Sequence, residues 1–371
     1  MNKTVVTYLA EYEFFDHLVK IFGENSSLLA FIIFLVFAGI VVGIMATIGG
    51  LGTYAERKIS ADLQMRIGPN RVGPYGLLQF LADGVKMMTK EDIMPAGADK
   101  FLFYLAPMLA LVGVFATLAV LPFSGGFIMT DLNVGVFYLI AISSLVGLAV
   151  FLGGYSSNSK WAMLGGMRGA SQIISYEIPV TLSILAIVLL AGGMSFGVIV
   201  GQQTGVPTNW FIFHNPFAFI AFFIYFVGAM AETNRAPFDL PEAESELVSG
   251  YHTEYTGMRF GFFALAEYIE VFVVCGVAVA LFLGGYNLPF QLDMDILPIQ
   301  AVQAVIFFSK TFVLYYVVIW ARWTLPRLRV DQLMAVCWKY LTPIAIFNLI
   351  GCAVWMVVFK GHSFAHIMFG H

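Results

Sequence analysis

Residues 231–260 read AETNRAPFDLPEAESELVSGYHTEYTGMRF, and this stretch is the one place where a very apolar chain concentrates acid. It carries two cations, Arg235 and Arg259, and six carboxylates: Glu232, Asp239, Glu242, Glu244, Glu246 and Glu254. Pro237 and Pro241 restrict the backbone and remove two donors, which favours a shaped turn over a free tether. If residues 242–246 are extended, their three glutamates point the same way. A solvated loop is the alternative interpretation.

Apolar runs of membrane-spanning length end and begin at this stretch, and they set the fold class. The chain has 371 residues, of which 60% are hydrophobic and 11% charged, and its mean hydropathy is +0.85. These values lie outside the usual composition of soluble domains. We therefore predict a polytopic membrane protein.

The predicted architecture is all-α, a single membrane domain over residues 1–371 with eight transmembrane helices, because a hydrocarbon core about 30 Å thick needs roughly 20 apolar residues per helix. The expected spans are residues 28–50, 102–122, 134–154, 173–193, 212–231, 260–284, 301–321 and 341–359. All fifteen Lys and Arg residues between the spans lie in the first, third, fifth and seventh loops. The positive-inside rule then places loops 51–101 and 232–259 in the cytoplasm and both termini outside.

The first loop contains a second helical pattern. Leu77, Leu78, Leu81, Val85 and Met88 recur at helical spacing, while the polar residues between them occupy the other side. This pattern predicts an amphipathic helix at the membrane surface or under a partner protein. An ordinary surface helix would need a soluble core that the other loops are too short to supply.

Ionisable residues inside the expected spans are the strongest functional signal, because each one near a helix centre costs roughly 2.5 to 3.5 kcal/mol on insertion scales. They are Glu177, Glu267, Glu270 and Lys310. With Glu232 at the end of the fifth span, the acids form a candidate proton relay leading from the acidic loop into the bilayer. The alternative is that Lys310, Arg168 or Arg322 neutralises these acids and the pairs only help the helices to pack.

Other classes of site find little support. Cys275, Cys337 and Cys352 are far apart in the sequence, which argues against an iron–sulfur or zinc centre on this chain. The net charge of −4 excludes a basic nucleic-acid-binding face. No phosphate-binding or hydrolytic motif is present, and we expect no metal site and no cofactor bound by this chain.

Five segments together resemble a known family. They are AERKISADLQMRIGPNRVGP (55–74), LLQFLADGVKMMTKED (77–92), SYEIP (175–179), the stretch 231–260, and RWTLPRLRVDQLM (322–334). The chain closely resembles the H subunits of bacterial respiratory complex I, from about Leu28 to Phe359.

The resemblance implies a site and its residues. Residues expected at a quinone-reduction chamber are Arg57, Asp62, Phe238, Glu242, Glu244 and Glu246. Those expected to begin a proton relay are Glu177, Glu232, Glu267 and Glu270. Basic residues expected to hold loops and neighbouring subunits are Arg168, Arg235, Arg259, Lys310, Arg322, Arg327 and Arg329.

The resemblance also implies a setting in a multi-pass subunit of the bacterial inner membrane. Quinone would be the substrate, with ubiquinone expected rather than menaquinone, and flavin and iron–sulfur clusters would belong to partner subunits. Expected partners are the peripheral quinone-site and iron–sulfur subunits, small membrane-arm subunits and lipid. The membrane subunit of an energy-converting hydrogenase, an ion-coupled transporter and a purely structural anchor remain alternatives.

Overall fold

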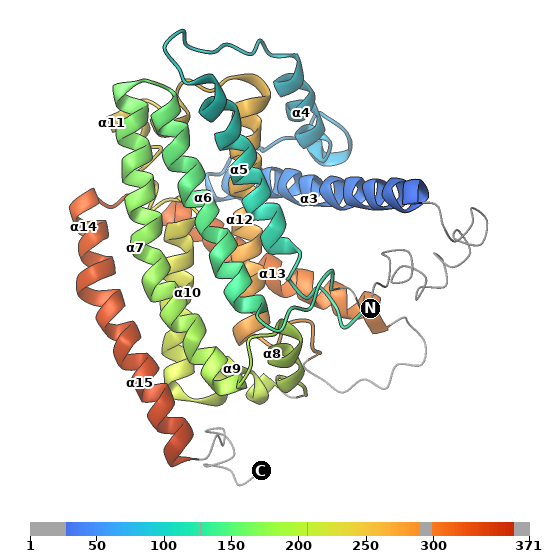
Figure 1. Cartoon of the computed structure of the whole chain (residues 1–371), viewed down its shortest axis with the longest axis vertical. Helices are drawn as coiled ribbons and strands as arrows, with labels where there is room; N and C mark the ends of the chain where they lie inside the picture. Colours follow the sequence, from blue (N-terminus) through green and yellow to red (C-terminus); the bar gives the residue numbers. More distant parts are fainter. Residues whose placement is uncertain (1–26, 127, 206, 289–298, 360–371) are drawn as a thin grey trace. The chain divides into compact units, whose positions relative to one another are not determined.

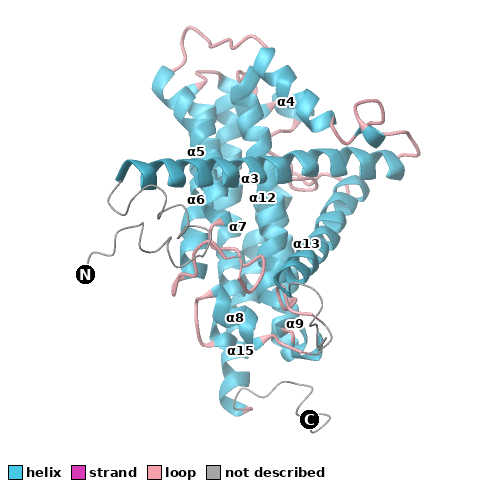
Figure 2. Cartoon of the chain, turned by 90° about the vertical axis from the view of Figure 1, so that its right-hand side faces the viewer, coloured by secondary structure: helices cyan, strands magenta, loops and turns pink. Residues whose placement is uncertain are grey.

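The computed structural model describes residues 27–126, 128–205, 207–288 and 299–359, and side chains at 27–34, 37, 244 and 245 are outside this description. Both chain termini, for which a periplasmic location is predicted, lie outside the described ranges. Within these ranges every regular element is a helix (Figure 2). The chain divides into two compact units between Ile48 and Gly49, and all the candidate site residues discussed below belong to the second.

Within the described ranges, seven helices are long and apolar enough to cross a membrane. They are α3 (Ser27–Leu63), α5 (Lys100–Leu118), α6 (Gly135–Ser156), α7 (Lys160–Ala191), α12 (Gly257–Phe282), α13 (Ile299–Thr324) and the continuous segment Val330–Val358. That last segment comprises α14 (Val330–Ala335), a π-helical turn (Val336–Leu341) and α15 (Thr342–Val358). The all-helical membrane fold is thus confirmed, whereas the count of eight spans stays a prediction.

The eighth expected span corresponds to α10 (Pro216–Glu232), an apolar helix of 17 residues. Its start is well defined, because Pro216 occupies the first turn and the Asn215 side chain accepts from the backbone N–H of Ala218. Short helices precede it on the way from α7, namely α8 (Phe196–Gln202), η2 (Pro207–Asn209) and α9 (Phe211–His214).

Two helices extend beyond the apolar runs that predicted them. Helix α3 continues to Leu63, so Arg57 and Asp62 lie on a helix rather than in a loop. Helix α7 begins at Lys160, which places Arg168 on its first three turns. High hydropathy identifies the lipid-facing part of a helix. Backbone hydrogen bonds can extend the same helix beyond its apolar residues and into water.

Helix α12 is the most enclosed of the spanning helices. It packs on α5, α10 and α13. Of the residues in its most apolar stretch, 83% are buried, compared with 17% in the Val330–Val358 segment. Figure 1 shows α5, α6, α7, α10, α12 and α15 running lengthwise side by side. The acids of α12 therefore face protein and not lipid.

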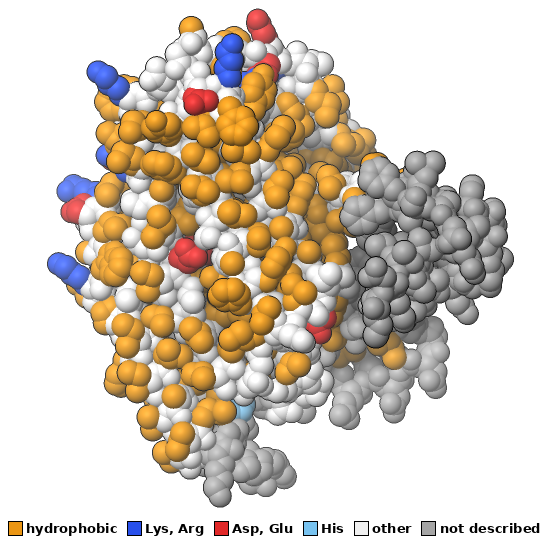
Figure 3. Space-filling model, viewed as in Figure 1, with side chains coloured by type: hydrophobic (Ala, Val, Ile, Leu, Met, Phe, Trp, Pro, Cys, Tyr) orange, Lys and Arg blue, Asp and Glu red, His pale blue; other side chains and the backbone are white. Residues whose placement is uncertain are grey.

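The predicted amphipathic helix is present as α4 (Gln79–Thr89), after the short turn η1 (Pro74–Gly76). One face carries the exposed residues Leu81, Val85 and Met88, while α12 packs against the helix. Figure 3 shows apolar side chains over most of the visible face and Lys and Arg near its upper and left borders.

Candidate functional site: a buried row of ionisable residues

The acidic stretch is packed between helices, contrary to the solvated-loop alternative. Phe238, Leu240, Leu247 and Tyr251 are all buried. From α7, the buried Gln172 amide donates to the carbonyl oxygens of Ala231 and Phe238 and to the Asn234 side chain, at 2.7 to 3.2 Å. A buried amide shared among backbone acceptors fixes the course of the segment, because each acceptor left unpaired would cost free energy.

The turn at Gly250 brings the end of this segment back onto its beginning. Gly250 has a φ of +62°, and a Cβ there would overlap the Pro241 carbonyl. Only glycine fits both requirements. The turn leads into η3 (Gly250–His252), which carries Tyr251 and His252 toward Glu242.

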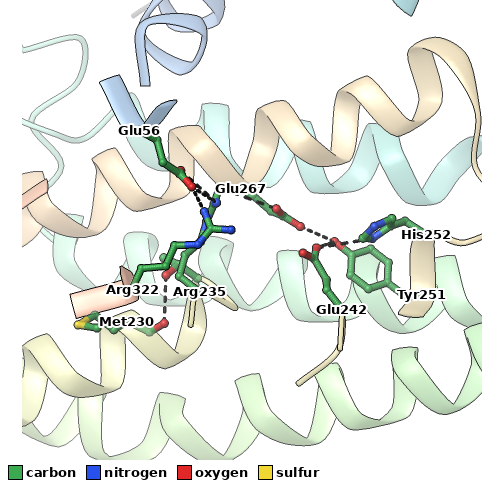
Figure 4. Close-up of polar contacts among 9 residues, drawn as sticks. Glu56, Met230, Arg235, Glu242, Tyr251, His252, Glu267 and Arg322 are labelled. Atoms are coloured by element: carbon green, nitrogen blue, oxygen red, sulfur yellow. Dashed lines mark hydrogen bonds and ion pairs between the residues drawn. The ribbon is translucent and has the colours of Figure 1, made fainter. Parts of the chain in front are cut away.

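One half of the buried row consists of two arginines that share a carboxylate (Figure 4). Glu56 of α3 is 8% exposed. The Arg235 Nη1 atom lies 3.2 and 3.4 Å from the two Glu56 carboxylate oxygens, and Arg322 of α13 pairs with the same carboxylate. Arg235 also stacks on the Tyr268 ring, with its Cζ atom 4.2 Å from the centroid. Three elements distant in sequence are joined by one buried carboxyl group.

The other half of the row consists of acids and their hydrogen-bond partners. Glu267 of α12 lies 4.0 Å from Arg235 Nη2 and accepts a 2.7 Å hydrogen bond from the Tyr251 hydroxyl. The same hydroxyl lies 3.5 Å from Glu242, whose Oε1 is also 3.5 Å from His252 Nδ1. Glu56, Arg235, Glu267, Tyr251, Glu242 and His252 thus follow one another in space.

Burial shifts the proton affinities at the loop end of the row. It raises the pKa of Glu242 above its usual value, and the nearby Arg235 and the Tyr251 hydroxyl oppose this effect. Burial lowers the pKa of His252, so the imidazole is neutral at pH 7. Burial thus favours the uncharged form of both Glu242 and His252.

A second group of acids surrounds an internal cavity of about 40 Å³. Glu177 of α7, Glu232 of α10 and Glu270 of α12 line it together with Tyr225 and otherwise mostly apolar residues. A cavity of this size with several polar groups has room for water. The structure thus brings together three of the four predicted relay acids.

Helix α12 connects the two groups. Glu267 in the row and Glu270 at the cavity are three residues apart, so they lie on neighbouring positions of one helix. All four predicted relay acids consequently belong to two clusters joined by a single helical turn.

Of the three loop glutamates, Glu242 and Glu246 do not point the same way. Residues Glu244–Leu247 form the helical turn α11, in which a spacing of two no longer shares a face. Glu242 joins the buried row, whereas Glu246 is half-exposed and pairs with Arg168 at 2.6 Å. The Glu244 side chain lies outside the described residues. The condition of an extended segment is not met, because a short helix forms there.

The remaining predicted chamber residues take different positions. Arg57 is half-exposed and bridges to Asp83 of α4 at 2.5 Å. Asp62 is exposed near the end of α3. Phe238 is buried, with its ring 5.7 Å from that of Tyr176. The five predicted chamber residues whose side chains are described therefore do not form one cluster.

Two of the predicted basic residues pair with carboxylates outside the spanning helices. Arg327 pairs with Asp239 and Arg259 with Asp92, each at 2.8 Å. The Arg329 backbone N–H donates to Gln332 at the start of α14.

Lys310 has backbone partners instead of acids. Its Nζ donates to the carbonyl oxygens of Leu283, Gly285 and Asn287 at 2.8 to 3.1 Å and lies over the Trp210 ring. Cations at a helix C-terminus satisfy its free carbonyl groups. Lys310 thus completes the end of α12, and it is not the cation that neutralises the relay acids, one of three that the packing alternative named.

Comparisons with known proteins identify the family of this chain. A family profile described as NADH dehydrogenase matches residues 34–353. The chain is 45% identical over 337 residues to the H subunit of NADH-quinone oxidoreductase from Anaeromyxobacter dehalogenans, covering 87% of this chain and 82% of that protein. The H subunits from Chlorobaculum tepidum and Bacteroides fragilis are each 47% identical, covering 82% and 87% of this chain and 87% and 90% of their own lengths.

The chain belongs to the family of NADH-quinone oxidoreductase H subunits. The resemblance inferred from the five motifs is thereby confirmed. In this family member, the part of the chain that the structure describes has no group of three or more His, Cys, Asp or Glu residues suited to a metal ion.

Glu56 of this H-type chain was not among the site residues predicted from the sequence. The expected cytoplasmic loop includes the residue, and a carboxylate beside Arg57 is unremarkable in a loop. The helical continuation of α3 to Leu63 is the signal that could have found it, since it places Glu56 and Arg57 on different faces of a helix.

Proposed function

We propose that this chain is the membrane subunit that lines the quinone-reduction chamber of a proton-translocating NADH:quinone oxidoreductase and begins its carboxylate relay. The observation that carries the proposal is the row from Glu56 to His252, which continues through α12 to the cavity of Glu177, Glu232 and Glu270. The names of the related H subunits favour this function over an energy-converting hydrogenase or a transporter.

The chemistry of quinone reduction fits such a row. Reduction to the quinol takes two electrons and two protons. Negative charge that develops in a poorly solvated chamber raises the proton affinity of nearby groups. A proton taken up at Glu242 and Glu267 changes the field at Glu270, one helical turn away, and so biases the protonation of the acids around the cavity.

The proposal assigns quinone as substrate, with ubiquinone expected rather than menaquinone. Flavin and iron–sulfur clusters would sit on partner subunits, because electrons from NADH must reach the chamber from outside this chain. The exposed charged residues near α4 and α11 would face peripheral subunits on the cytoplasmic side, and the termini would face the periplasm.

Two neutral substitutions test the relay in membrane vesicles that contain the assembled complex. Glu232→Gln and Glu267→Gln keep the size of each side chain and remove its titration. We expect proton translocation per NADH oxidised to fall several-fold in both variants, with a smaller loss of quinone reduction for Glu232→Gln.

Glu91→Gln, which alters an exposed carboxyl group, is the matched control and should leave both rates unchanged. Normal pumping in both test variants would remove these residues from the pathway and refute the relay.

A further inference from the structure

Glu56 is a buried carboxylate with two arginine partners. It lies on α3 between Arg235, which precedes the Pro237 turn, and Arg322 of α13. Its side chain is 10% exposed and that of Arg235 8% exposed. Water therefore provides little compensation for these charges, and their partners within the protein must supply it.

The charges around Glu56 do not balance among themselves. Two guanidinium cations share one carboxylate, which leaves one positive charge in excess. The next carboxylate is Glu267, whose Oε2 lies 4.0 Å from Arg235 Nη2. That same Nη2 atom, and Nε, are buried without a hydrogen-bond partner in the described structure. Arg235 thus has donors available on the side of the relay acid.

We propose that Glu56 is a positioning residue that holds Arg235 beside Glu267 and cancels one of the two arginine charges. In this way it sets the pH at which the Glu242 and Glu267 pair takes up a proton during turnover. This inference rests on the proposed function, because it assumes that proton uptake at this pair accompanies quinone reduction.

Other charged and titratable groups also face Glu242 and Glu267, and these groups remain unchanged in the test. They are Arg235, Asp239, Tyr251, His252 and Glu270. Asp239 is already tied to Arg327, while Tyr251 and His252 approach from η3. Glu56 and Arg322 come from two further elements, so they can be altered without touching the groups that bind the proton.

The test is a charge-neutralisation series measured as the pH profile of NADH:quinone reductase activity in membrane vesicles. Glu56→Gln removes the negative charge that offsets the two arginines. The added positive charge favours the ionised carboxylates of Glu242 and Glu267 and so disfavours their protonation. We expect the alkaline limb of the profile to move about one pH unit lower. Arg322→Gln removes positive charge, and the limb should move upward by a similar amount.

The double variant Glu56→Gln/Arg322→Gln restores the original net charge and should return the limb close to its original pH. Glu56→Asp keeps the charge on a shorter side chain. It should lower kcat while leaving the limb in place. Glu91→Gln, an exposed carboxyl change, should move nothing. A merely structural role for Glu56 predicts lower activity in every variant with no shift of opposite sign.

The amount of assembled complex is measured for each variant. If Glu56→Gln does not assemble, the comparison of Arg322→Gln with Arg322→Lys decides, because only the first should move the limb upward. Shifts in the same direction for Glu56→Gln and Arg322→Gln, or no shift in assembled Arg322→Gln, would overturn the inference. The proposed function has a separate test, since it fails if Glu242→Gln and Glu267→Gln leave activity and pumping unchanged.

Discussion

At the scale of single residues, Asp239 shows burial and ion pairing acting in opposite directions. Its carboxylate pairs with Arg327 at 2.8 Å, which favours the charged form. Burial nevertheless dominates and raises the pKa of Asp239 to about 6. The folded state therefore binds a proton more tightly than the unfolded state does.

This difference predicts a pH-dependent stability of the loop around Asp239. Between the unfolded value near 4 and the folded value of about 6, stability falls as pH rises, because the native state must release a proton that it holds well. The ionised group then costs up to about 3 kcal/mol. We expect hydrogen exchange in residues 233–243, corrected for the intrinsic rate, to slow as the pH falls from 7 to 5.

Asp239→Asn is the control for this pH dependence, since the amide oxygen still accepts from Arg327 but does not titrate. Exchange in the same segment of this variant should lose most of its pH dependence. An equally strong dependence in the variant would assign the effect to another group, such as Glu242.

At the scale of elements, helix α12 could be predicted as a span, but not the way in which it ends. Its apolar run and the spacing of Glu267 and Glu270 are readable from the sequence, since both follow from helical periodicity. The contact of Lys310 with the carbonyl groups after Phe282 depends on how α13 packs against α12. No local pattern encodes that contact.

We expect Lys310→Met to destabilise the end of α12. The substitution leaves three carbonyl oxygens without their charged donor, which should cost about 2 to 4 kcal/mol. The measurement is the thermal unfolding temperature of the purified complex in detergent. Lys339→Met is the matched control, because Lys339 is exposed, and it should unfold close to the unaltered protein. Equal unfolding temperatures for the two variants would contradict this role of Lys310.

At the scale of the whole molecule, the all-helical membrane fold could be predicted from composition and apolar run length alone. The interior of the candidate site could be predicted only in part. Glu177, Glu267 and Glu270 were predicted because charged groups at membrane depth are costly, whereas Glu56 was missed because it lies outside the apolar run. Its importance comes from Arg235 and Arg322, which are more than 170 residues away in sequence.

The orientation of the chain across the membrane can be tested with single cysteines. Cys275, Cys337 and Cys352 are buried, so an introduced cysteine reports its own side of the membrane. The distribution of Lys and Arg predicts that Lys160→Cys reacts with a membrane-impermeant maleimide only in inverted vesicles. Thr204→Cys should react only in intact spheroplasts. Denatured samples provide the control for total thiol, and the reverse labelling pattern would invert the proposed topology.

The enclosure of α12 also has a consequence for biogenesis. A helix with Glu267 and Glu270 in its apolar segment would enter lipid at a cost of roughly 5 kcal/mol or more if both were charged. In the finished fold these acids meet Arg235, Tyr251 and a small cavity instead. We therefore expect the insertion machinery to retain α12 until α5, α7 and α10 surround it, so that this helix leaves the translocon as part of a preassembled group.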